Sequence, residues 1–455
     1  MEKQLPKNWI NVYLQDVTKN VKGKKPKIQS EVEFEGSIPY MDIKALEYHV
    51  IRQFADIESS KHFEEGDVAM VWDGARSGWV SKTNFGAIGS TLVAFKPIKI
   101  NSNYLFYYLL EKYPFINSNA RGVGIPHVDP TVLWGLDFPL PPLAEQNRIV
   151  AKLDTLFAQL ETIKASMAKI PVLLKEFRHQ VLTQAVTGKL TEEWRKGKEL
   201  EEWDKCILLD VIIEKPRNGF SPKGVEYETP VKSLTLSATT SGKFNPLFVK
   251  YLDIDLPPSN SHLWLKNGDI LIQRSNSLDY VGTSAIYDGK DFDFIYPDIM
   301  MKVKSNDSIL NNFLIYTLSS QGTRKYYRDN ASGTAGNMPK INQEIVSKTP
   351  IYLPSLNEQQ EIVSRVESLF AKADAIEQQY QALKEKINNL PQALLHKAFK
   401  GELTKQLESD GDARELLHQI QELKNSTVKP KKATSKKVKK YPENETVLGM
   451  VAEPE

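Results

Sequence analysis

The chain has 455 residues, of which 41% are hydrophobic and 25% charged, so it is long enough for two or three domains with real cores and is not a disordered chain. Its single cysteine, Cys206, excludes an internal disulfide and a cysteine-based metal site, and fits a reducing cytoplasm. The formal net charge is only +2, and residues 429–440 hold seven lysines, so the rest of the chain has more acidic than basic residues and charge alone does not predict nucleic-acid binding.

Residues 1–140 predict a first globular domain of mixed strand and helix. Short β-branched and aromatic runs broken by turn-forming residues are typical of strands, as at residues 67–72 and 91–95. Residues 103–112 predict a short helix. The expected fold class is therefore α+β.

Residues 141–190 predict a long helix, followed by a linker at residues 191–203. Apolar residues recur at alternating spacings of four and three, which is the pattern of a coiled-coil seam. We expect Pro171 to kink or divide this helix and Gly188 to end it. The first stripe consists of Ile149, Leu153, Leu156, Leu160, Ile163, Met167, Ile170, Leu174, Phe177 and Val181.

Residues 204–352 predict a second globular domain. Strand-like runs occur at residues 269–273 and 299–303, and residues 312–320 predict a short helix. The domain is thus of the same mixed class as the first.

Residues 353–404 predict a second long helix, in which we expect Pro391 to cause a kink or a break and Gly401 to end the helix. Its stripe consists of Ile362, Val366, Leu369, Ala373, Ile376, Tyr380, Leu383, Ile387, Leu390 and Leu394. Residues 405–455 are a C-terminal extension, with a short helix expected at residues 414–423 and a basic tail expected to be disordered.

An internal repeat relates the two halves of the chain. Residues 140–191 align with residues 353–404 at a constant offset of 213, and 16 of the 52 aligned positions are identical. The globular segments have diverged further than the helices, which indicates two versions of one task rather than duplication for bulk stability. Both stripes occupy the same register of the repeat, so a pseudo-twofold axis would pair the two helices, most simply antiparallel.

The duplicated strings resemble the conserved regions of type I restriction–modification specificity subunits. They are LPPLAEQxxIVxxLDxLFA at 140–158 and AxxGxLT at 185–191, with second copies at 353–371 and 398–404. The resemblance covers about residues 1–405. It implies two target-recognition domains separated by two long antiparallel coiled-coil helices.

In that family each target-recognition domain reads one half of a split double-stranded DNA sequence. The helices set the distance between the halves and dock two methyltransferase (modification) subunits, and restriction/translocase subunits bind further out. The resemblance therefore predicts a DNA sequence-recognition subunit without catalytic activity of its own. S-adenosylmethionine, ATP and Mg would belong to the partner subunits, with no cofactor in this chain.

Polar loop residues after the expected strands are the candidates for contacts with DNA bases, because Arg and Lys suit guanine and Asn suits adenine. For any one of them, a solvated loop side chain is an equally good interpretation. The candidates are Arg76, Ser77, Trp79, Lys82, Asn84, Arg121 and His127 in the first domain, and Arg274, Ser275, Asn276, Ser277, Arg324, Lys325, Arg328, Asn337 and Lys340 in the second.

The sequence offers no catalytic or metal-binding residue that can be named. Residues 245–248 are the nearest match to an adenine methyltransferase motif, but they lack its second proline and a glycine-rich cofactor loop before it. No G-x-x-x-x-G-K-[ST] phosphate loop occurs, and the histidines lack metal-ligand spacing. No run of about 18 apolar residues is present either, so no membrane partner is expected.

Two alternatives stay open. One is a self-contained DNA methyltransferase or nuclease fused to recognition domains, against which the missing motifs count. The other is a coiled-coil protein scaffold without base readout. Both globular segments have formal charges close to zero, so the isolated chain is expected to bind DNA weakly.

Overall fold

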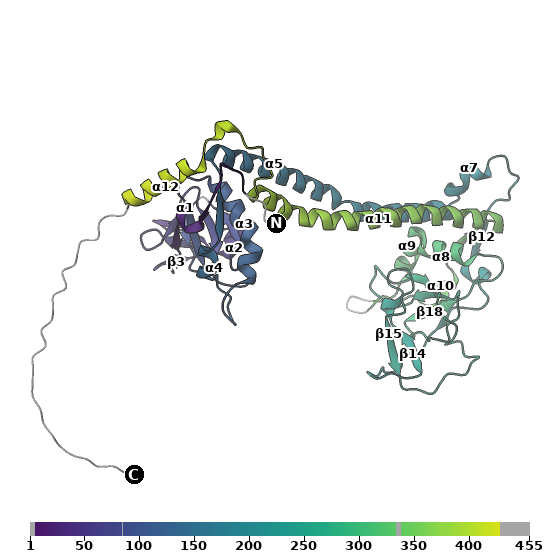
Figure 1. Ribbon diagram of the computed structural model, residues 1–455. Helices are drawn as coiled ribbons and strands as arrows, with labels where there is room; N and C mark the ends of the chain where they lie inside the picture. The colour runs from purple at the N-terminus through teal and green to yellow at the C-terminus, as the bar shows by residue number, and fades with distance from the viewer. Residues whose placement is uncertain (1–4, 84, 334–337, 428–455) are drawn as a thin grey trace, which may run out of the picture. The chain divides into compact units, whose positions relative to one another are not determined.

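The computed structural model describes residues 5–83, 85–333 and 338–427, and the chain divides into two compact units (Figure 1). Unit 1 contains Met1–Glu161 and Ile387–Glu455, and unit 2 contains the residues between them. Unit 1 therefore combines segments from both halves of the chain. The lysine-rich segment 429–440, together with its expected disorder, lies outside the described residues.

Unit 1 has a central four-stranded antiparallel sheet in the order β2-β10-β7-β8. A five-stranded sheet, β3-β5-β4-β9-β6, and a two-stranded sheet, β1-β11, complete its strands. Strand β7 is buried along its whole length, which explains its unbroken apolar sequence. The strands are β1 (Ile10–Tyr13), β2 (Thr18–Lys22), β3 (Gln29–Ser30), β4 (Ser37–Met41), β5 (Phe54–Asp56), β6 (His62–Phe63), β7 (Val68–Val71), β8 (Val80–Lys82), β9 (Gly86–Ile88), β10 (Leu92–Pro97) and β11 (Asp137–Leu140).

The main core of unit 1 includes helix α3 and the end of helix α11. Tyr104 and Tyr108 of α3 are fully buried, and each ring packs edge-on against Phe138 and Phe399 at centroid distances of 4.7–5.8 Å. Phe399 comes from the second half of the chain, so unit 1 cannot complete its core without it. The helices are α1 (Leu14–Val17), α2 (Ile43–Tyr48), α3 (Ser102–Ser118), α4 (Pro130–Trp134) and α12 (Ala413–Thr427), with parts of α5 (Leu143–Met167) and α11 (Leu356–Phe399) and the short turn η4 (Glu408–Asp410).

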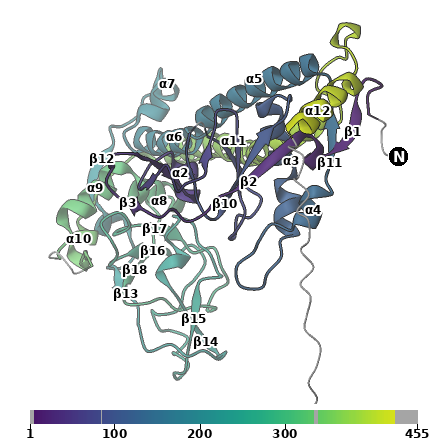
Figure 2. The ribbon, with the colours of Figure 1, turned by 90° about the vertical axis from the view of Figure 1, so that its left-hand side faces the viewer.

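Unit 2 repeats this plan with fewer strands. Its four-stranded antiparallel sheet has the order β13-β18-β16-β17 (Figure 2). Strand β16 is buried along its whole length, as β7 is. Two-stranded sheets β12-β19 and β14-β15 complete the strands. The strands are β12 (Asp204–Ile207), β13 (Arg217–Asn218), β14 (Val231–Leu234), β15 (Val249–Leu252), β16 (Ile270–Gln273), β17 (Ser284–Ile286), β18 (Met300–Val303) and β19 (Pro350–Leu353).

Helices α8 and α9 both contribute buried residues to the main core of unit 2, and a break at Ser320 separates them. The helices expected at residues 103–112, 312–320 and 414–423 are thus confirmed as α3, α8 and α12. The elements of unit 2 are α6 (Ile170–Val186), α7 (Glu192–Arg195), α8 (Asn311–Ser319), α9 (Gln321–Asn330) and α10 (Gln343–Ser347), with the short turns η1 (Lys189–Thr191), η2 (Leu208–Val211) and η3 (Leu236–Ala238).

The two prolines of the long helices have different outcomes. The first helix is divided, because α5 ends at Met167 and α6 begins at Ile170 with Pro171 in its first turn, where the missing N–H costs nothing. Helix α11 instead continues through Pro391, so the expected break there is absent. Burial of Phe399 in the core of unit 1 holds the segment beyond Pro391 in place.

The helix ends agree with the sequence. Gly188 and Gly401 have φ angles of 76° and 70°, a left-handed conformation that glycine adopts without strain, and each lies directly after a long helix.

Only one of the two heptad positions in each stripe is regularly buried. In the first stripe the buried series, at most 8% exposed, recurs every seven residues: Leu153, Leu160, Met167, Leu174 and Val181. The residues between them are more exposed, and Ile163 and Phe177 reach 46% and 39%. In the second stripe Ile376 and Leu383 are 49% and 47% exposed. The apolar stripe expected along each helix is therefore present, and part of it faces solvent in this chain.

Within unit 2, α6 and the first part of α11 run antiparallel. Arg178 pairs with Glu377 at 2.7 Å, whereas the carbonyl of Leu190, further along the chain, accepts a hydrogen bond from Arg365 at 3.0 Å. Rising residue numbers on one side thus meet falling numbers on the other, as the repeat predicts (Figure 1).

A buried glutamate near the start of α5 ties the repeat copies together in unit 1. Glu145 is fully buried, and its carboxylate accepts hydrogen bonds from Trp9 Nε1 (2.8 Å), Thr404 Oγ1 (3.3 Å) and Gln406 Nε2 (2.9 Å). Thr404 ends the second copy of the AxxGxLT string. The second repeat copy therefore supplies a hydrogen-bond donor, Thr404, to Glu145 of the first copy.

The same arrangement occurs near the start of α11 in unit 2. Glu358 is 1% exposed and accepts from Trp203 Nε1 (3.1 Å) and Thr191 Oγ1 (2.7 Å), with the Arg195 guanidinium 3.6 Å away. Thr191 ends the first copy of the AxxGxLT string. The motif strings that carried the family resemblance therefore contain residues that hydrogen-bond one repeat copy to the other.

Candidate nucleic-acid interface

The backbone that follows β7 forms a turn held by three hydrogen bonds. Trp72 N donates to Thr91 O (2.8 Å), and Trp72 O accepts from Val128 N (2.9 Å). Gly74 N donates to Pro126 O (2.8 Å). These bonds bring the segment around residues 121–128 against the end of the central strand.

The backbone that follows β16 makes the equivalent bonds in unit 2. Arg274 N donates to Ile299 O (2.8 Å), Arg274 O accepts from Ile341 N (2.9 Å), and Asn276 N donates to Pro339 O (3.3 Å). The two units therefore build one backbone frame with different side chains. We call these frames the first platform (residues 72–78 and 121–128) and the second platform (residues 274–282 and 338–341).

The first platform gathers charged and aromatic side chains from three segments. His127 Nδ1 lies 2.6 Å from Asp73 Oδ1, and Lys22 Nζ lies 3.8 Å from Asp73 Oδ2 and 5.7 Å from the Trp72 ring. Arg121 and His127 exchange backbone hydrogen bonds of 2.8 and 2.7 Å, which closes a hairpin. The structure thus joins two predicted residues with Lys22, Trp72 and Asp73, which loop polarity in the sequence did not single out.

Arg121 is held by the start of the next helix. Its Nε lies 2.5 Å from Asp129 Oδ2, and Asp129 also caps α4 through the Thr131 N–H. The hydrogen bonds from Arg121 and from the helix N–H keep the pKa of Asp129 below its usual value against the effect of burial. The guanidinium side chain is still 62% exposed, so it can reach a further partner.

The remaining candidates of the first domain have intramolecular partners. Arg76 pairs with Glu47 at 2.7 Å, which raises the pKa of the guanidinium. Ser77 is fully buried, and Lys82 lies over the rings of two aromatic residues of α3. Trp79 is half-buried and packs against a core cluster. Asn84 lies outside the described residues.

In the second platform the candidates 274–277 and Lys340 lie together. Ser275 is 3% exposed and pairs through its backbone with Lys340, and Arg274 Nη1 donates to Asp298 O (3.3 Å). Asn276 Nδ2 donates to the buried Gln273 Oε1 (2.7 Å), and Ser277 N donates to Asn276 Oδ1 (2.8 Å). Ser277 and Lys340 are exposed.

The candidates on α9 divide between inward and outward positions. Arg324 is half-buried and donates to backbone carbonyls of the loop after β16. Lys325 and Arg328 are exposed, and Lys325 pairs with Asp329 one turn later on the helix. Asn337 lies outside the described residues. Contact with DNA remains a prediction for all these residues.

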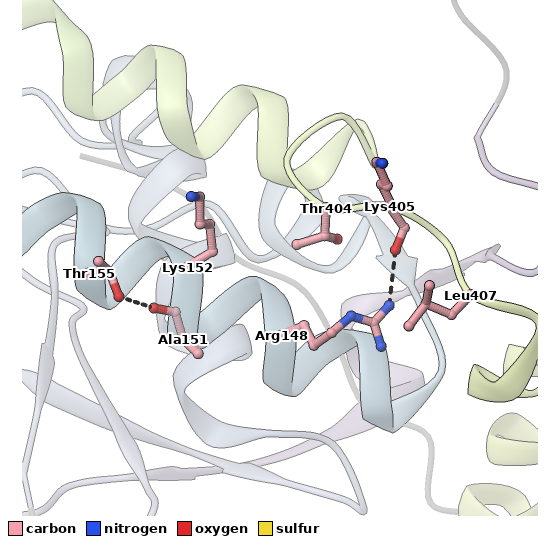
Figure 3. Close-up of a pocket in the computed structure, with 7 residues that line it drawn as sticks. All are labelled: Arg148, Ala151, Lys152, Thr155, Thr404, Lys405 and Leu407. Atoms are coloured by element: carbon pink, nitrogen blue, oxygen red, sulfur yellow. Dashed lines mark hydrogen bonds between the residues drawn. The ribbon is translucent and has the colours of Figure 1, made fainter.

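A hollow of about 460 Å³ in unit 1 lies where α5 meets the segment after α11 (Figure 3). Arg148 Nη2 donates to Lys405 O at 3.1 Å across it and pairs with Asp410 at 2.6 Å, so its charge is compensated. This pairing lowers the pKa of Asp410. The hollow thus lies at the packing interface of two chain segments within unit 1. Its lining residues are Arg148, Ala151, Lys152, Thr155, Thr404, Lys405 and Leu407.

Within residues 5–83, 85–333 and 338–427, no group of three or more His, Cys, Asp or Glu side chains is arranged to hold a metal ion. In the same part of the chain, no helix is both long and apolar enough to cross a membrane.

The family model for the type I restriction modification DNA specificity domain matches residues 6–171 and 234–385. Among curated proteins, the chain is 36% identical over 293 residues to the type I restriction enzyme EcoKI specificity subunit of Escherichia coli strain K12, covering 64% of this chain and 63% of that protein. It is 33% identical to the StySPI specificity subunit of Salmonella potsdam, covering 75% of this chain and 73% of that one.

Solved structures show the same fold. The HsdS subunit from Thermoanaerobacter tengcongensis matches with a TM-score of 0.59 at 18% identity, covering 88% of this chain and 99% of that chain. A chain from a structure of a type I restriction–modification system, described as addressing complex assembly and conformational transition, matches with a TM-score of 0.61 at 19% identity over 88% of this chain and 100% of that chain.

Proposed function

The chain belongs to the family of type I restriction–modification DNA specificity proteins, and from that membership we propose that it reads a bipartite DNA target, one half-site per recognition domain. The recognition domains would be residues 1–140 and 204–352. The spacer helices would comprise residues 141–190 and 353–404.

One observation carries this proposal. The two platforms share the same backbone hydrogen bonds but present different side chains, Asp73 and His127 in one and Ser275 and Lys340 in the other. A shared frame with different hydrogen-bonding groups suits two sites that read different bases in the same way.

The partners are proposed from the exposed apolar residues of the heptad stripes. Exposed apolar side chains that recur along a helix, such as Ile163, Ile376 and Leu383, favour contact with another protein. We assign this face to two methyltransferase subunits, with restriction/translocase subunits bound further out. S-adenosylmethionine, ATP and Mg would belong to those subunits, and this chain would contribute no catalytic residue. Because such a complex acts on cellular DNA, we place its work in the cytoplasm.

The test is to purify the chain with its modification subunits and to identify the sequences that the complex methylates in a random DNA pool. We expect two short specific halves separated by a gap without base preference. Exchanging side chains of the first platform should change one half, and exchanging those of the second platform should change the other.

Absence of any sequence preference would favour the protein-scaffold alternative. Methylation of DNA by the purified chain alone with S-adenosylmethionine would favour the enzyme alternative. Either result would overturn the proposal.

A further inference from the structure

Each platform loop is supported by one side chain from a neighbouring helix. In unit 1, Asn117 Nδ2 of α3 donates to Ala75 O (3.2 Å) and Ser77 O (2.9 Å). The two carbonyls lie three residues and one residue before Gly78. A single amide group therefore fixes two peptide groups of a loop at the end of the central sheet.

In unit 2 a different residue makes the equivalent contacts. Arg324 of α9 donates from Nη2 to Asp279 O (2.8 Å) and from Nη1 to Val281 O (2.7 Å). These carbonyls again lie three residues and one residue before a glycine, Gly282. The two units therefore support the same two loop positions with chemically different side chains.

The two glycines bring each loop directly onto its helix. Gly78 and Gly282 have φ angles of 89° and 77°. A Cβ on Gly78 would lie 2.6 Å from Ile116 Cγ2, and a Cβ on Gly282 would lie 2.3 Å from Tyr327 Cδ2. Each glycine N–H also donates at 2.7 Å to a carbonyl at the end of the central strand. The loops are thus held at their ends and along their length.

The loops differ in length and in what they expose. Six residues separate Val71 from Gly78, whereas eight separate Gln273 from Gly282. The longer loop exposes two large side chains, Leu278 (54%) and Tyr280 (44%). The two units therefore differ most in the loop residues, whereas both keep a helix side chain and a glycine that hold the loop.

We propose that residues 74–76 and 277–280 contact base edges of the DNA, and that Asn117 and Arg324 are positioning residues that hold these loops in the conformation that reads each half-site. The proposal rests on the proposed function and names where its specificity lies. Fixing a loop before binding lowers the entropy lost on binding and penalises partners that require another loop shape.

DNA is the partner that the surroundings favour. In unit 2 the exposed Lys340 lies on the same platform as the loop. In unit 1 the exposed Lys22 lies beside the first platform, next to Asp73, and both lysines are suited to phosphate contacts. Apolar and aromatic side chains such as Leu278 and Tyr280 suit thymine methyl groups and base faces.

Arg324 and its loop depend on each other electrostatically. Burial, together with the nearby positive charge of Arg328, lowers the pKa of Arg324 to about 10, so the guanidinium stays charged at neutral pH. No carboxylate pairs with it in the part of the chain that the structure describes. The carbonyls of Asp279 and Val281 are therefore the groups that stabilise the charge of Arg324. Removing the guanidinium would leave the loop without these two hydrogen bonds.

The experiment uses the full chain with its modification subunits and measures methylation rates on DNA duplexes with single-base changes in either half-site. We expect Arg324→Met to reduce discrimination about tenfold or more in one half-site, because each wrong base ordinarily costs about 1–3 kcal/mol. Discrimination in the other half-site should stay unchanged. Asn117→Ala should show the opposite assignment, and Arg324→Lys should restore part of the loss.

The matched controls are Asn330→Ala at the end of α9 and Asn119→Ala at the C-cap of α3. Both side chains are exposed, and each amide donates to a backbone carbonyl four residues earlier, Tyr326 O for Asn330 and Phe115 O for Asn119. The Asn119 amide also makes a long contact with Ser118 Oγ. Neither amide contacts a platform loop in these bonds, so both half-sites should keep their discrimination. Tyr280→Ala removes an exposed side chain without touching the fold and should affect the same half-site as Arg324→Met.

Unchanged discrimination in both half-sites for Arg324→Met and Tyr280→Ala would overturn the proposal, even if methylation became slower. So would an equal loss in both half-sites. If the unmodified complex shows no half-sites at all, the proposed function fails instead, so the two failures are distinguishable.

Discussion

At the scale of single residues, the duplicated glutamates show how the two repeat copies are linked within each unit. Glu145 and Glu358 are buried carboxylates, and each accepts hydrogen bonds from a tryptophan and from a threonine of the other repeat copy. Hydrogen bonds to a charged group contribute about 1.5–3 kcal/mol each. The position of these glutamates near helix N-termini adds a favourable interaction with the helix dipole.

We predict that Glu358→Ala lowers the free energy of unfolding by about 2–4 kcal/mol, because it leaves the Trp203 indole without its acceptor and the Thr191 hydroxyl with only a long contact to Gly188 O (3.4 Å). Urea denaturation would measure the loss, and hydrogen exchange should rise around η1 and the start of α11. The control is Glu361→Ala on the same helix, which removes only a partly exposed ion pair with Arg365 and should cost less than about 1 kcal/mol. Equal losses for both variants would contradict the assignment.

The residue scale also shows where reasoning from the sequence stops. Loop polarity identified Ser77 and Arg324, but their side chains support their own unit, since one is buried and the other bonds to loop carbonyls. Asp73 was missed because an acidic residue after a strand gives no signal for DNA. Only the fold shows that it meets His127 and Lys22. Direction and partner of a loop side chain are tertiary properties.

At the scale of elements, the heptad pattern predicted the long helices, because it is a local periodicity, and the repeat predicted their antiparallel pairing through a pseudo-twofold axis. Neither could predict that some stripe residues, such as Ile163, Ile376 and Leu383, stay exposed. An apolar stripe has the same pattern whether its partner lies in the same chain or in another protein. The difference between Pro171 and Pro391 was equally hidden, because it depends on which segment has a core to hold it.

We predict opposite sensitivities for the two prolines. Pro391→Ala should raise the free energy of unfolding by about 1–3 kcal/mol, because it restores a helical N–H and removes the clash of the ring with the preceding turn inside α11. Pro171→Ala should change it by less than about 0.5–1 kcal/mol, because a first-turn residue has no helical hydrogen bond to gain. Thermal unfolding of the two variants side by side would measure this. A gain from Pro171→Ala, with none from Pro391→Ala, would contradict it.

At the scale of the whole molecule, the charge distribution indicates that sequence recognition and non-specific attraction to DNA come from different parts of the complex. The chain has a net charge of only +2 although seven lysines lie within residues 429–440. Sequence-independent attraction to DNA depends on the number of phosphate charges neutralised. The recognition units should therefore contribute specificity, and most of the binding free energy should come from the proposed partner subunits.

We therefore predict that the isolated chain binds DNA weakly and that its residual affinity depends on the basic segment. Removing residues 428–455 should weaken binding and flatten the dependence of log K on log salt by up to about 0.9 per lysine that contacts a phosphate. Removing residues 441–455 alone is the matched control, since it deletes four acidic residues and no basic ones and should leave affinity equal or higher. Fluorescence anisotropy across a salt series would measure both. Tight, salt-tolerant and sequence-specific binding by the isolated chain would contradict the argument, because nearly neutral units cannot supply it through phosphate contacts.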